Sequence, residues 1–283
     1  MMKTGLVLEG GAHRAIYTAG VLDVFMENNI HFDGVVGVSA GAIHGGSFVA
    51  GQKGRNIGYT LKYASDKRYM SFYSFLTTGD LVGKKFCYED LPDVLVPFDY
   101  EAFKKSKTKF YATCSNLETG KADLIEIKDM KKQMDVLRAS ASMPLVSQIV
   151  EIGSQKYLDG GISDSIPLRA FQKLGYKKCV VIETRPDGYE KKPNSLSFIA
   201  KIVYRKYPNF IKAICLRHNH YNAELKDIEN AAQKGEIFLI KPSKNLKISR
   251  MEKNKNKLKS MYDLGRKDAL NILPEIKKFL TAK

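Results

Sequence analysis

The chain has 283 residues, of which 44% are hydrophobic, and this is enough apolar material for the buried core of one large domain or two small ones. No apolar run reaches the roughly 18–20 residues of a membrane span, and the N-terminal stretch MMKTGLVLEGG lacks the features of a signal peptide. The four cysteines form no C-x-x-C pair, so neither a zinc site nor a disulfide framework is indicated. We expect a soluble, cytoplasmic protein without a metal.

The net charge of +16 is placed unevenly along the chain. Residues 1–100 carry nine Lys and Arg against ten Asp and Glu, whereas the remaining residues carry 37 against 20. Such a basic surface attracts anionic membranes or nucleic acid, although solvated lysines also serve solubility alone. Because no helix-turn-helix, zinc or aromatic-glycine RNA motif is present, we expect no nucleic-acid partner. Peripheral contact with an anionic membrane stays open.

The first 51 residues predict a strand–helix–strand–helix unit. An apolar run at 6–8 stops at a glycine pair, and residues 14–29 carry the broad apolar stripe of a helix. FDGVVGVS (32–39) predicts a second strand and 40–51 a second helix. This alternation indicates a parallel sheet with helices on both faces.

The later segments extend this sheet. Residues 86–106 predict helix with turns, and further strands are expected at 109–116, 121–127, 178–184 and 236–243. We therefore expect an α/β protein, a three-layer α/β/α fold with a mainly parallel central sheet. Residues 1–175 would form its core. Residues 176–283 would complete the sheet and add a basic helical extension that does not fold independently.

The C-terminal extension contains a predicted amphipathic helix. Ser249 and Glu252 fit a capping box, and an apolar face continues from Met251 to Ile272. Lysines at 253, 255, 257 and 259 crowd the polar side. Two interpretations stay open, namely a docked helix with a solvated face and a helix that lies on a membrane surface.

Residues 35–45, VVGVSAGAIHG, lead an apolar run into G-V-S-A-G at 37–41. A G-x-S-x-G pattern between a strand and a helix is typical of a nucleophile elbow, whose sharp turn exposes the serine hydroxyl. Gly37 and Gly41 would let strand and helix approach closely, and the helix N-terminus favours developing negative charge. Since the pattern also arises by chance at an ordinary helix start, the role of Ser39 depends on its partners.

A serine hydroxyl needs a base within hydrogen-bonding distance. None of the histidines makes a convincing triad: they are His13, His31, His44, His218 and His220. Asp159 in YLDGG follows a short apolar run, and the two glycines allow a tight turn where the strand ends of an open parallel sheet converge. The carboxylate of Asp159 would then serve as the base directly, unless the segment is only an Asp-Gly turn.

A glycine-containing loop, EGGAHRA at 9–15, leads from the first predicted strand into the first helix. Its backbone N–H groups can face an anion. The spacing is not that of a dinucleotide-binding G-x-G-x-x-G, and the G-K-[ST] of a P-loop is missing. An oxyanion hole fits this loop better than a nucleotide site, and no cofactor is expected.

These three motifs together resemble the patatin-like phospholipase family. The resemblance covers about residues 4–170, with RASASMP (138–144) as a further family-like segment, and the remainder looks like the C-terminal extension of bacterial members. It implies that Ser39 is the nucleophile and Asp159 its base in a Ser-Asp dyad without histidine. It also implies oxyanion binding at Gly10, Gly11, Ala12, His13 and Arg14, with Arg14 as the basic residue usual in that loop.

The resemblance implies ester hydrolysis through an acyl-Ser39 intermediate, with a lipid or another acyl ester as the substrate. Thioesterase, transacylase and peptidase activities use the same dyad. The loop departs from the family pattern at Ala12 and Ala15, where glycine is usual, and alanine disfavours positive φ. The alternative is therefore a non-catalytic relative that binds anionic membranes. The apolar segments 68–76 and 196–214 would line an acyl pocket, form a lid or belong to the core.

Overall fold

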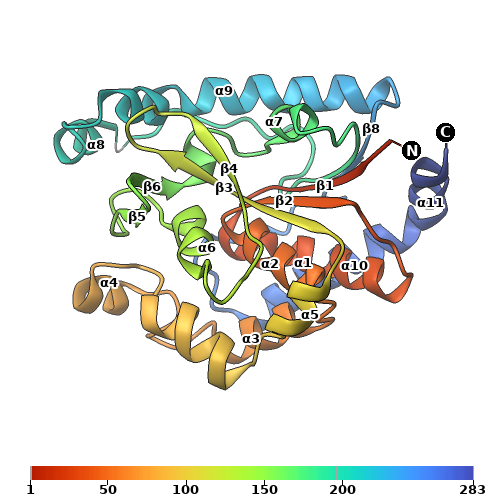
Figure 1. The fold of residues 1–283 in the computed structure, drawn as a ribbon, viewed down its shortest axis with the longest axis horizontal. Helices are drawn as coiled ribbons and strands as arrows, with labels where there is room; N and C mark the ends of the chain where they lie inside the picture. The colour runs from red at the N-terminus through yellow and green to blue at the C-terminus, as the bar shows by residue number, and fades with distance from the viewer. Residues whose placement is uncertain (1, 196, 283) are drawn as a thin grey trace.

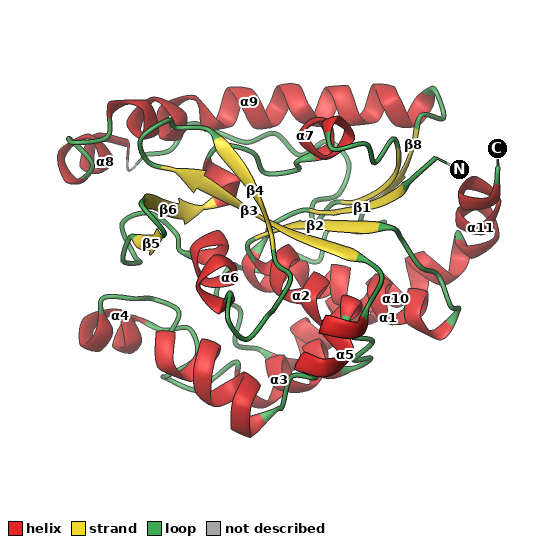
Figure 2. Cartoon of the chain, viewed as in Figure 1, coloured by secondary structure: helices red, strands yellow, loops and turns green. Residues whose placement is uncertain are grey.

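The computed structural model describes residues 2–195 and 197–282, which form three layers around one mixed sheet (Figures 1 and 2). The sheet order is β5-β6-β3-β2-β1-β7-β8, and β4 also pairs with β3. Strands β3, β2, β1, β7 and β8 run parallel, whereas β4 and β6 are antiparallel to β3, and β5 is antiparallel to β6. The strands are β1 (Thr4–Leu8), β2 (Gly34–Val38), β3 (Lys109–Asn116), β4 (Ala122–Glu126), β5 (Val150–Ile152), β6 (Gln155–Asp159), β7 (Lys178–Ile182) and β8 (Ile237–Ile240).

Helices cover both faces of the sheet, as the sequence predicts (Figure 1). One face carries α1 (Ile16–Glu27), α2 (Ala40–Val49), α6 (Met134–Ala141) and α10 (Lys255–Asn271). The other carries α7 (Leu168–Lys173) and the long α9 (Pro208–Gln233). Beyond α2 lie α3 (Arg55–Tyr63), α4 (Phe72–Thr78), the π-helix η2 (Phe86–Leu95) and α5 (Tyr100–Lys105). The remaining elements are α8 (Ser197–Val203), α11 (Leu273–Thr281) and the short turns η1 (Ala12–Ala15) and η3 (Gly160–Ile162). Among the described residues, no helix is both long and apolar enough to cross a membrane.

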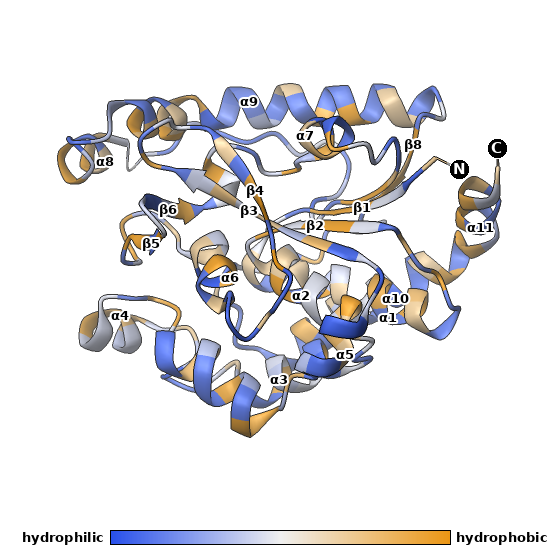
Figure 3. Ribbon diagram, in the orientation of Figure 1, coloured by the Kyte–Doolittle hydropathy of each residue, from blue (hydrophilic) through white to orange (hydrophobic). Residues whose placement is uncertain are grey.

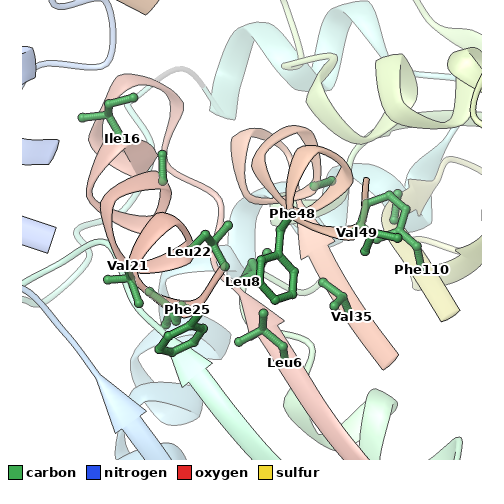
Figure 4. Close-up of a cluster of buried hydrophobic side chains, with 14 of the residues drawn as sticks. Leu6, Leu8, Ile16, Val21, Leu22, Phe25, Val35, Phe48, Val49 and Phe110 are labelled. Carbon is green, nitrogen blue, oxygen red and sulfur yellow. The ribbon is translucent and has the colours of Figure 1, made fainter. Parts of the chain in front are cut away.

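The core follows from the alternation of side chains along the central strands. Leu6 and Leu8 of β1 face α1 and α2, where they join a cluster that contains Phe25 and Phe48 (Figure 4). Val7, between them, points to the opposite face and belongs to the cluster under α7 and α9. Figure 3 shows the apolar central strands between helices with hydrophilic outer faces. Each such fully buried side chain contributes about 1.5–3 kcal/mol to the free energy of unfolding.

The C-terminal helix α10 is docked on α1. A Cβ atom added to Gly20 of α1 would lie 2.2 Å from the carbonyl oxygen of Tyr262, and one added to Gly265 of α10 would lie 2.1 Å from that of Tyr17. The two helices therefore approach so closely that neither position accepts a larger side chain. Leu258 is also fully buried. This arrangement favours the docked-helix interpretation over the membrane-surface one.

The predicted capping box at the start of this helix is wrong. Helix α10 begins at Lys255, and the Oδ1 atom of Asn254 caps it by accepting the amides of Asn256 (3.0 Å) and Lys257 (3.2 Å). The preceding segment cannot join the helix, because the carbonyl of Arg250 accepts the amide of His13 (3.3 Å) and holds the chain against the loop after β1. A tertiary contact thus overrides a local capping pattern.

Candidate active site

Ser39 lies in a strained turn between β2 and α2. Its backbone has φ 55° and ψ −124°, a conformation that side chains rarely adopt and that costs about 1–3 kcal/mol. A Cβ atom at Gly37 would lie 2.5 Å from the Ala42 amide nitrogen, and one at Gly41 would lie 2.5 Å from the Leu8 carbonyl oxygen. Glycine is therefore required at both positions if the turn is to close.

Ser140, near the end of α6, supports this turn. Its fully buried hydroxyl accepts the Ser39 amide (2.9 Å) and donates to the Thr113 carbonyl of β3 (2.7 Å). The serine-rich segment that the sequence analysis noted beside the site thus holds the backbone of the candidate nucleophile.

Asp159 ends strand β6. Strand β6 itself runs antiparallel to β3, with Asp159 opposite Cys114. The carboxylate still comes close to Ser39 through the strand register. Val38, which ends β2, is opposite Thr113, the residue before Cys114. Strands β2 and β6 therefore end at the same level of the sheet.

The Asp159 carboxylate is 7% exposed. Its burial raises the pKa of the Asp159 carboxyl above the ordinary range, and four groups oppose this shift. They are the charge of Arg217, the Gly161 amide, which donates to Oδ1 at 2.8 Å, the nearby Ser39 side chain and the charge of Arg250. A desolvated carboxylate next to a serine hydroxyl has the arrangement that a general base needs.

No histidine within the described ranges is hydrogen-bonded to Ser39 or Asp159. His13 and His44 line a cavity that also reaches Ser39. Burial lowers the pKa of His13 and lowers that of His44 to about 4, so both are neutral at physiological pH. The Asp159 carboxylate, rather than either histidine, therefore stays the candidate base for Ser39.

The loop after β1 supplies fewer free amides than its sequence indicates. The amides of His13 and Arg14 already donate to the carbonyls of Arg250 (3.3 Å) and Gly11 (3.1 Å). An engaged N–H cannot also bind an oxyanion well, which weighs against the His13 amide as an oxyanion donor, whereas Arg14 was expected in the loop for its basic side chain. In the described part of the chain, the amides of Gly10, Gly11 and Ala12 have no such partner.

The two alanines of the loop differ in their effect. Ala12 has φ 48°, in the left-handed region that favours glycine, at a cost of roughly 1–2 kcal/mol. Ala15 has φ −67°, an ordinary helical value, and carries no such strain. The departure from the glycine pattern therefore matters at residue 12 alone.

Two cavities meet at Ser39. The apolar cavity extends below α2, and its wall includes Ile43, Met70, Leu91, Met130, Met134 and Leu137. The polar cavity, of about 340 Å³, is lined by the loop after β1 and by Asp159. Its wall also contains Arg185, Lys191, Arg217 and Arg250, none of which the sequence analysis assigned to the site.

These four cations escaped the sequence analysis because they carry no motif. They lie 26, 32, 58 and 91 residues after Asp159, at no regular spacing, so spacing gives no signal for them. The uneven charge of the chain was the sole indication, and it pointed to the surface rather than to a cavity. Within the described ranges, no cluster of three His, Cys, Asp or Glu side chains could hold a metal ion.

The model of the patatin-like phospholipase family matches residues 6–171, which is more than half of the chain. The chain belongs to this family. Patatin-like membership supports lipid acyl hydrolase activity in general, and the matched range contains Ser39, Asp159 and the loop after β1. A second match, to a domain of unknown function (DUF6363), covers residues 207–281 and contains Arg217 and Arg250 of the polar cavity.

This patatin-like chain is similar to a bacterial protein over nearly its whole length. It is 28% identical over 288 residues to the uncharacterized protein YjjU of Escherichia coli (strain K12), covering 99% of this chain and 80% of that protein. Among solved structures, VipD from Legionella pneumophila is similar with a TM-score of 0.49 and 12% identity, over 97% of this chain and 67% of that chain.

Proposed function

We propose that this patatin-like protein hydrolyses lipid acyl esters through an acyl-Ser39 intermediate, with Asp159 as the base. The observation that carries the proposal is the position of Ser39, in its strained turn, on the wall of the same cavity as the buried carboxylate of Asp159, whose pKa the Ser39 side chain lowers. Strain of this kind persists where the surrounding structure enforces it, and it is concentrated at functional sites.

The reaction would follow from these groups. Asp159 takes the hydroxyl proton as Ser39 Oγ bonds to the ester carbonyl carbon, and the free amides of Gly10, Gly11 and Ala12 face the oxyanion. The ester C–O bond then breaks, and the leaving alcohol receives the proton from Asp159. Water next attacks the acyl group while giving a proton to Asp159, which returns it to Ser39 as the fatty acid leaves.

The apolar cavity supports an acyl substrate, because its aliphatic and aromatic wall begins at Ser39. The segment 68–76 contributes Tyr69 and Met70 to this wall, so part of the segment that we considered for the acyl pocket lies there. An acyl chain in this cavity would place its carbonyl at the turn, with the alcohol portion in the polar cavity.

Labelling with a fluorophosphonate probe tests the nucleophile and its base. We expect Ser39→Ala to abolish labelling and Asp159→Asn to slow it at least 100-fold, since a positioned base contributes about 10²–10⁴-fold. Folded wild-type protein that takes up no probe would refute the hydrolase proposal and favour the non-catalytic, membrane-binding alternative.

Two matched variants serve as controls for this labelling. Ser165→Ala removes another buried hydroxyl from the same cavity, where Ser165 donates to the Gly161 carbonyl (2.9 Å). Asp80→Asn neutralises a carboxylate that is 5% exposed and also accepts one backbone amide, that of Gln148 (2.8 Å). Both should label at wild-type rates. Loss of labelling in Ser165→Ala would show that Ser39 is not the only serine that labelling requires, which would contradict its assignment as the nucleophile.

We further propose that α4 and α8 bring the site to an anionic membrane surface. Phe72 and Leu76 of α4 are 68% and 81% exposed, and Phe198 and Ile202 of α8 are 70% and 57% exposed. Both helices lie at the left end of the molecule in Figure 1, and Phe72 also lines the polar cavity. Exposed apolar side chains at the mouth of a lipid-binding cavity are typical of a membrane contact.

The charge beside these helices favours an anionic surface. Lys201, Arg205 and Lys206 are exposed on and directly after α8, and none of them forms an ion pair within the described residues. Each basic side chain near an anionic surface contributes about 1 kcal/mol to binding. These charges support a membrane contact on α8 rather than on the lysine-rich face of α10.

Flotation with vesicles tests this contact. We expect binding to phosphatidylglycerol vesicles, weakened by salt, and little binding to phosphatidylcholine vesicles. Phe198→Ser with Ile202→Ser should abolish it. Leu174→Ser, at a 48% exposed leucine after α7, should bind as wild type does. The proposed surface would be contradicted if the double variant and Leu174→Ser lost vesicle binding equally. It would also be contradicted if the wild-type protein bound phosphatidylglycerol and phosphatidylcholine vesicles equally.

A further inference from the structure

The wall of the polar cavity contains five basic side chains, which we call the cation cluster. They come from separate parts of the chain, namely η1, the loop after β7, α9 and the segment before α10, and are Arg14, Arg185, Lys191, Arg217 and Arg250. The acidic residues of the same wall are Glu9 and Asp159. The described part of the chain provides no ion pair for any member of the cluster, so the cavity has a clear excess of positive charge.

Contacts other than ion pairs hold the members of the cluster in place. The Arg185 guanidinium lies 4.0 Å from the centre of the Tyr189 ring, and the Lys191 ammonium lies 3.7 Å from that of Tyr221. Asn222 of α9 fixes the backbone of Lys191 by accepting its amide (2.8 Å) and donating to its carbonyl (3.0 Å). The cations are therefore positioned without using a carboxylate.

Glu9 does not neutralise the cluster directly. Its carboxylate accepts hydrogen bonds from the amide (2.5 Å) and hydroxyl (2.8 Å) of Thr184 and from the hydroxyl of Tyr221 (2.7 Å). Asp159 is engaged by Gly161 and Ser39, and Arg217 also donates to the Gly161 carbonyl. The donors of the remaining cations are left available to a ligand.

Mutual repulsion in the cluster agrees with this geometry. Burial and the positive charges of Arg217, Arg250 and Arg14 together lower the pKa of Lys191 to about 7, against the opposing charge of Glu9. Burial and the charge of Arg185 likewise lower the pKa of Arg14 to about 10. Buried like charges are costly unless an anion completes them.

We propose that the cation cluster binds a phosphate group of the substrate, so that the protein prefers acyl esters with a phosphate monoester over neutral esters. This inference rests on the proposed function. The cluster has five basic side chains against two carboxylates, and a phosphate monoester approaches two negative charges at neutral pH. Arginine forks match phosphate oxygens in pairs. The phosphate would lie in the polar cavity while the acyl chain fills the apolar one.

Hydrolysis of two esters with the same acyl chain tests this preference. The substrates are 1-oleoylglycerol 3-phosphate and 1-oleoylglycerol, which differ only in the phosphate. We expect a ratio of kcat/KM values of about 100 or more in favour of the phosphate ester, expressed mainly in KM. In Lys191→Gln with Arg250→Gln the ratio should fall below about 10. In Lys226→Gln, at an exposed lysine of the same helix as Arg217, it should not change.

A binding measurement separates this inference from the proposed function. Calorimetry on Ser39→Ala would use 1-O-octylglycerol 3-phosphate, which has an ether in place of the ester, and 1-O-octylglycerol. We expect binding of the phosphate compound alone, and at least tenfold weaker binding of inorganic phosphate.

The outcomes of the two measurements are distinct. Wild-type protein that hydrolyses both esters equally would overturn the phosphate inference and leave the hydrolase proposal standing. Protein that hydrolyses neither ester but binds the ether phosphate would overturn the hydrolase proposal and leave the phosphate site. Inorganic phosphate that binds as tightly as the octyl compound would contradict the assignment to a substrate.

Discussion

Replacing Ser140 by alanine isolates the support of the candidate nucleophile from its chemistry. The Ser140 hydroxyl accepts the Ser39 amide (2.9 Å) and is fully buried, so Ser140→Ala leaves that amide without a partner. An unsatisfied buried donor costs about 1–3 kcal/mol. Since a loss of 1 kcal/mol lowers Tm by about 2–4 °C in chains of this size, we expect Tm to fall by about 2–10 °C.

The same change should weaken the proposed reaction. Ser39 keeps φ 55° only while its surroundings enforce this conformation, and Ser140 provides one of those contacts. Because a misplacement of about 1 Å can cost on the order of 10²-fold in rate, we expect fluorophosphonate labelling to slow by about 10–100-fold. The assays are the labelling rate and the thermal unfolding of the same protein samples.

Ser142→Ala is the matched control for this prediction. Ser142 lies two residues further along, is 4% exposed, and its hydroxyl donates only to the Arg138 carbonyl (2.8 Å). Its removal leaves the contacts of Ser39 intact. Equal Tm values and equal labelling rates for Ser140→Ala and Ser142→Ala would refute the view that Ser140 holds the strained turn.

Three other changes test the site. Asp159→Asn should raise the free energy of unfolding at pH 7, because burial raises the pKa of the folded carboxyl and so penalises its charged form. This gain in free energy of unfolding should vanish below the pKa of the unfolded residue, where the carboxyl is neutral in both the folded and the unfolded state. Urea unfolding that gives the same gain at pH 7 and at pH 3 would contradict this prediction. Lys191, with a pKa of about 7, loses its charge as the pH rises from 6 to 8. The ratio of KM values of wild type to Lys191→Arg for the phosphate ester should therefore increase over this range, since ionisation of the phosphate affects both proteins alike, and a constant ratio would count against the assignment. Gly41→Ala should abolish labelling and destabilise the chain, because its Cβ would lie 2.5 Å from the Leu8 carbonyl oxygen. Gly58→Ala is the control, because Gly58 lies in a helix with open space around it, and this change should be neutral or stabilising by about 0.5–1 kcal/mol. Similar labelling of these two variants would show that the turn tolerates a side chain.

The sequence predicts most of the fold because its signals are local. The apolar run before the glycine pair and the pattern around Ser39 each determine a short element and the turn that follows it. The predicted strand at 109–116 coincides with β3, while those predicted at 121–127, 178–184 and 236–243 extend one to three residues beyond the observed strands. The three-residue strand β5 was missed, because so short a segment carries no measurable alternation.

Long-range contacts explain where prediction from sequence failed. The helix start at Ser249 was displaced because Arg250 is bound to the loop after β1. The His13 amide was counted among the oxyanion donors because its partner, the Arg250 carbonyl, cannot be read from the loop sequence. The antiparallel direction of β6 was not predicted, because it is set by pairing with the distant strand β3.

The sequence by itself determined the local turns that carry the candidate site, namely the G-x-S-x-G turn, the Asp-Gly-Gly segment and the glycine loop. Each of these turns depends on the conformational freedom of glycines next to it in the chain. Only the tertiary structure decided which of these groups meet. Strand register brings Asp159 to Ser39, and the packing of the C-terminal half brings Arg217 and Arg250 into the same cavity. Residues this far apart in the chain meet through the accumulated packing of the whole sheet and its helices, and no local pattern encodes that distance.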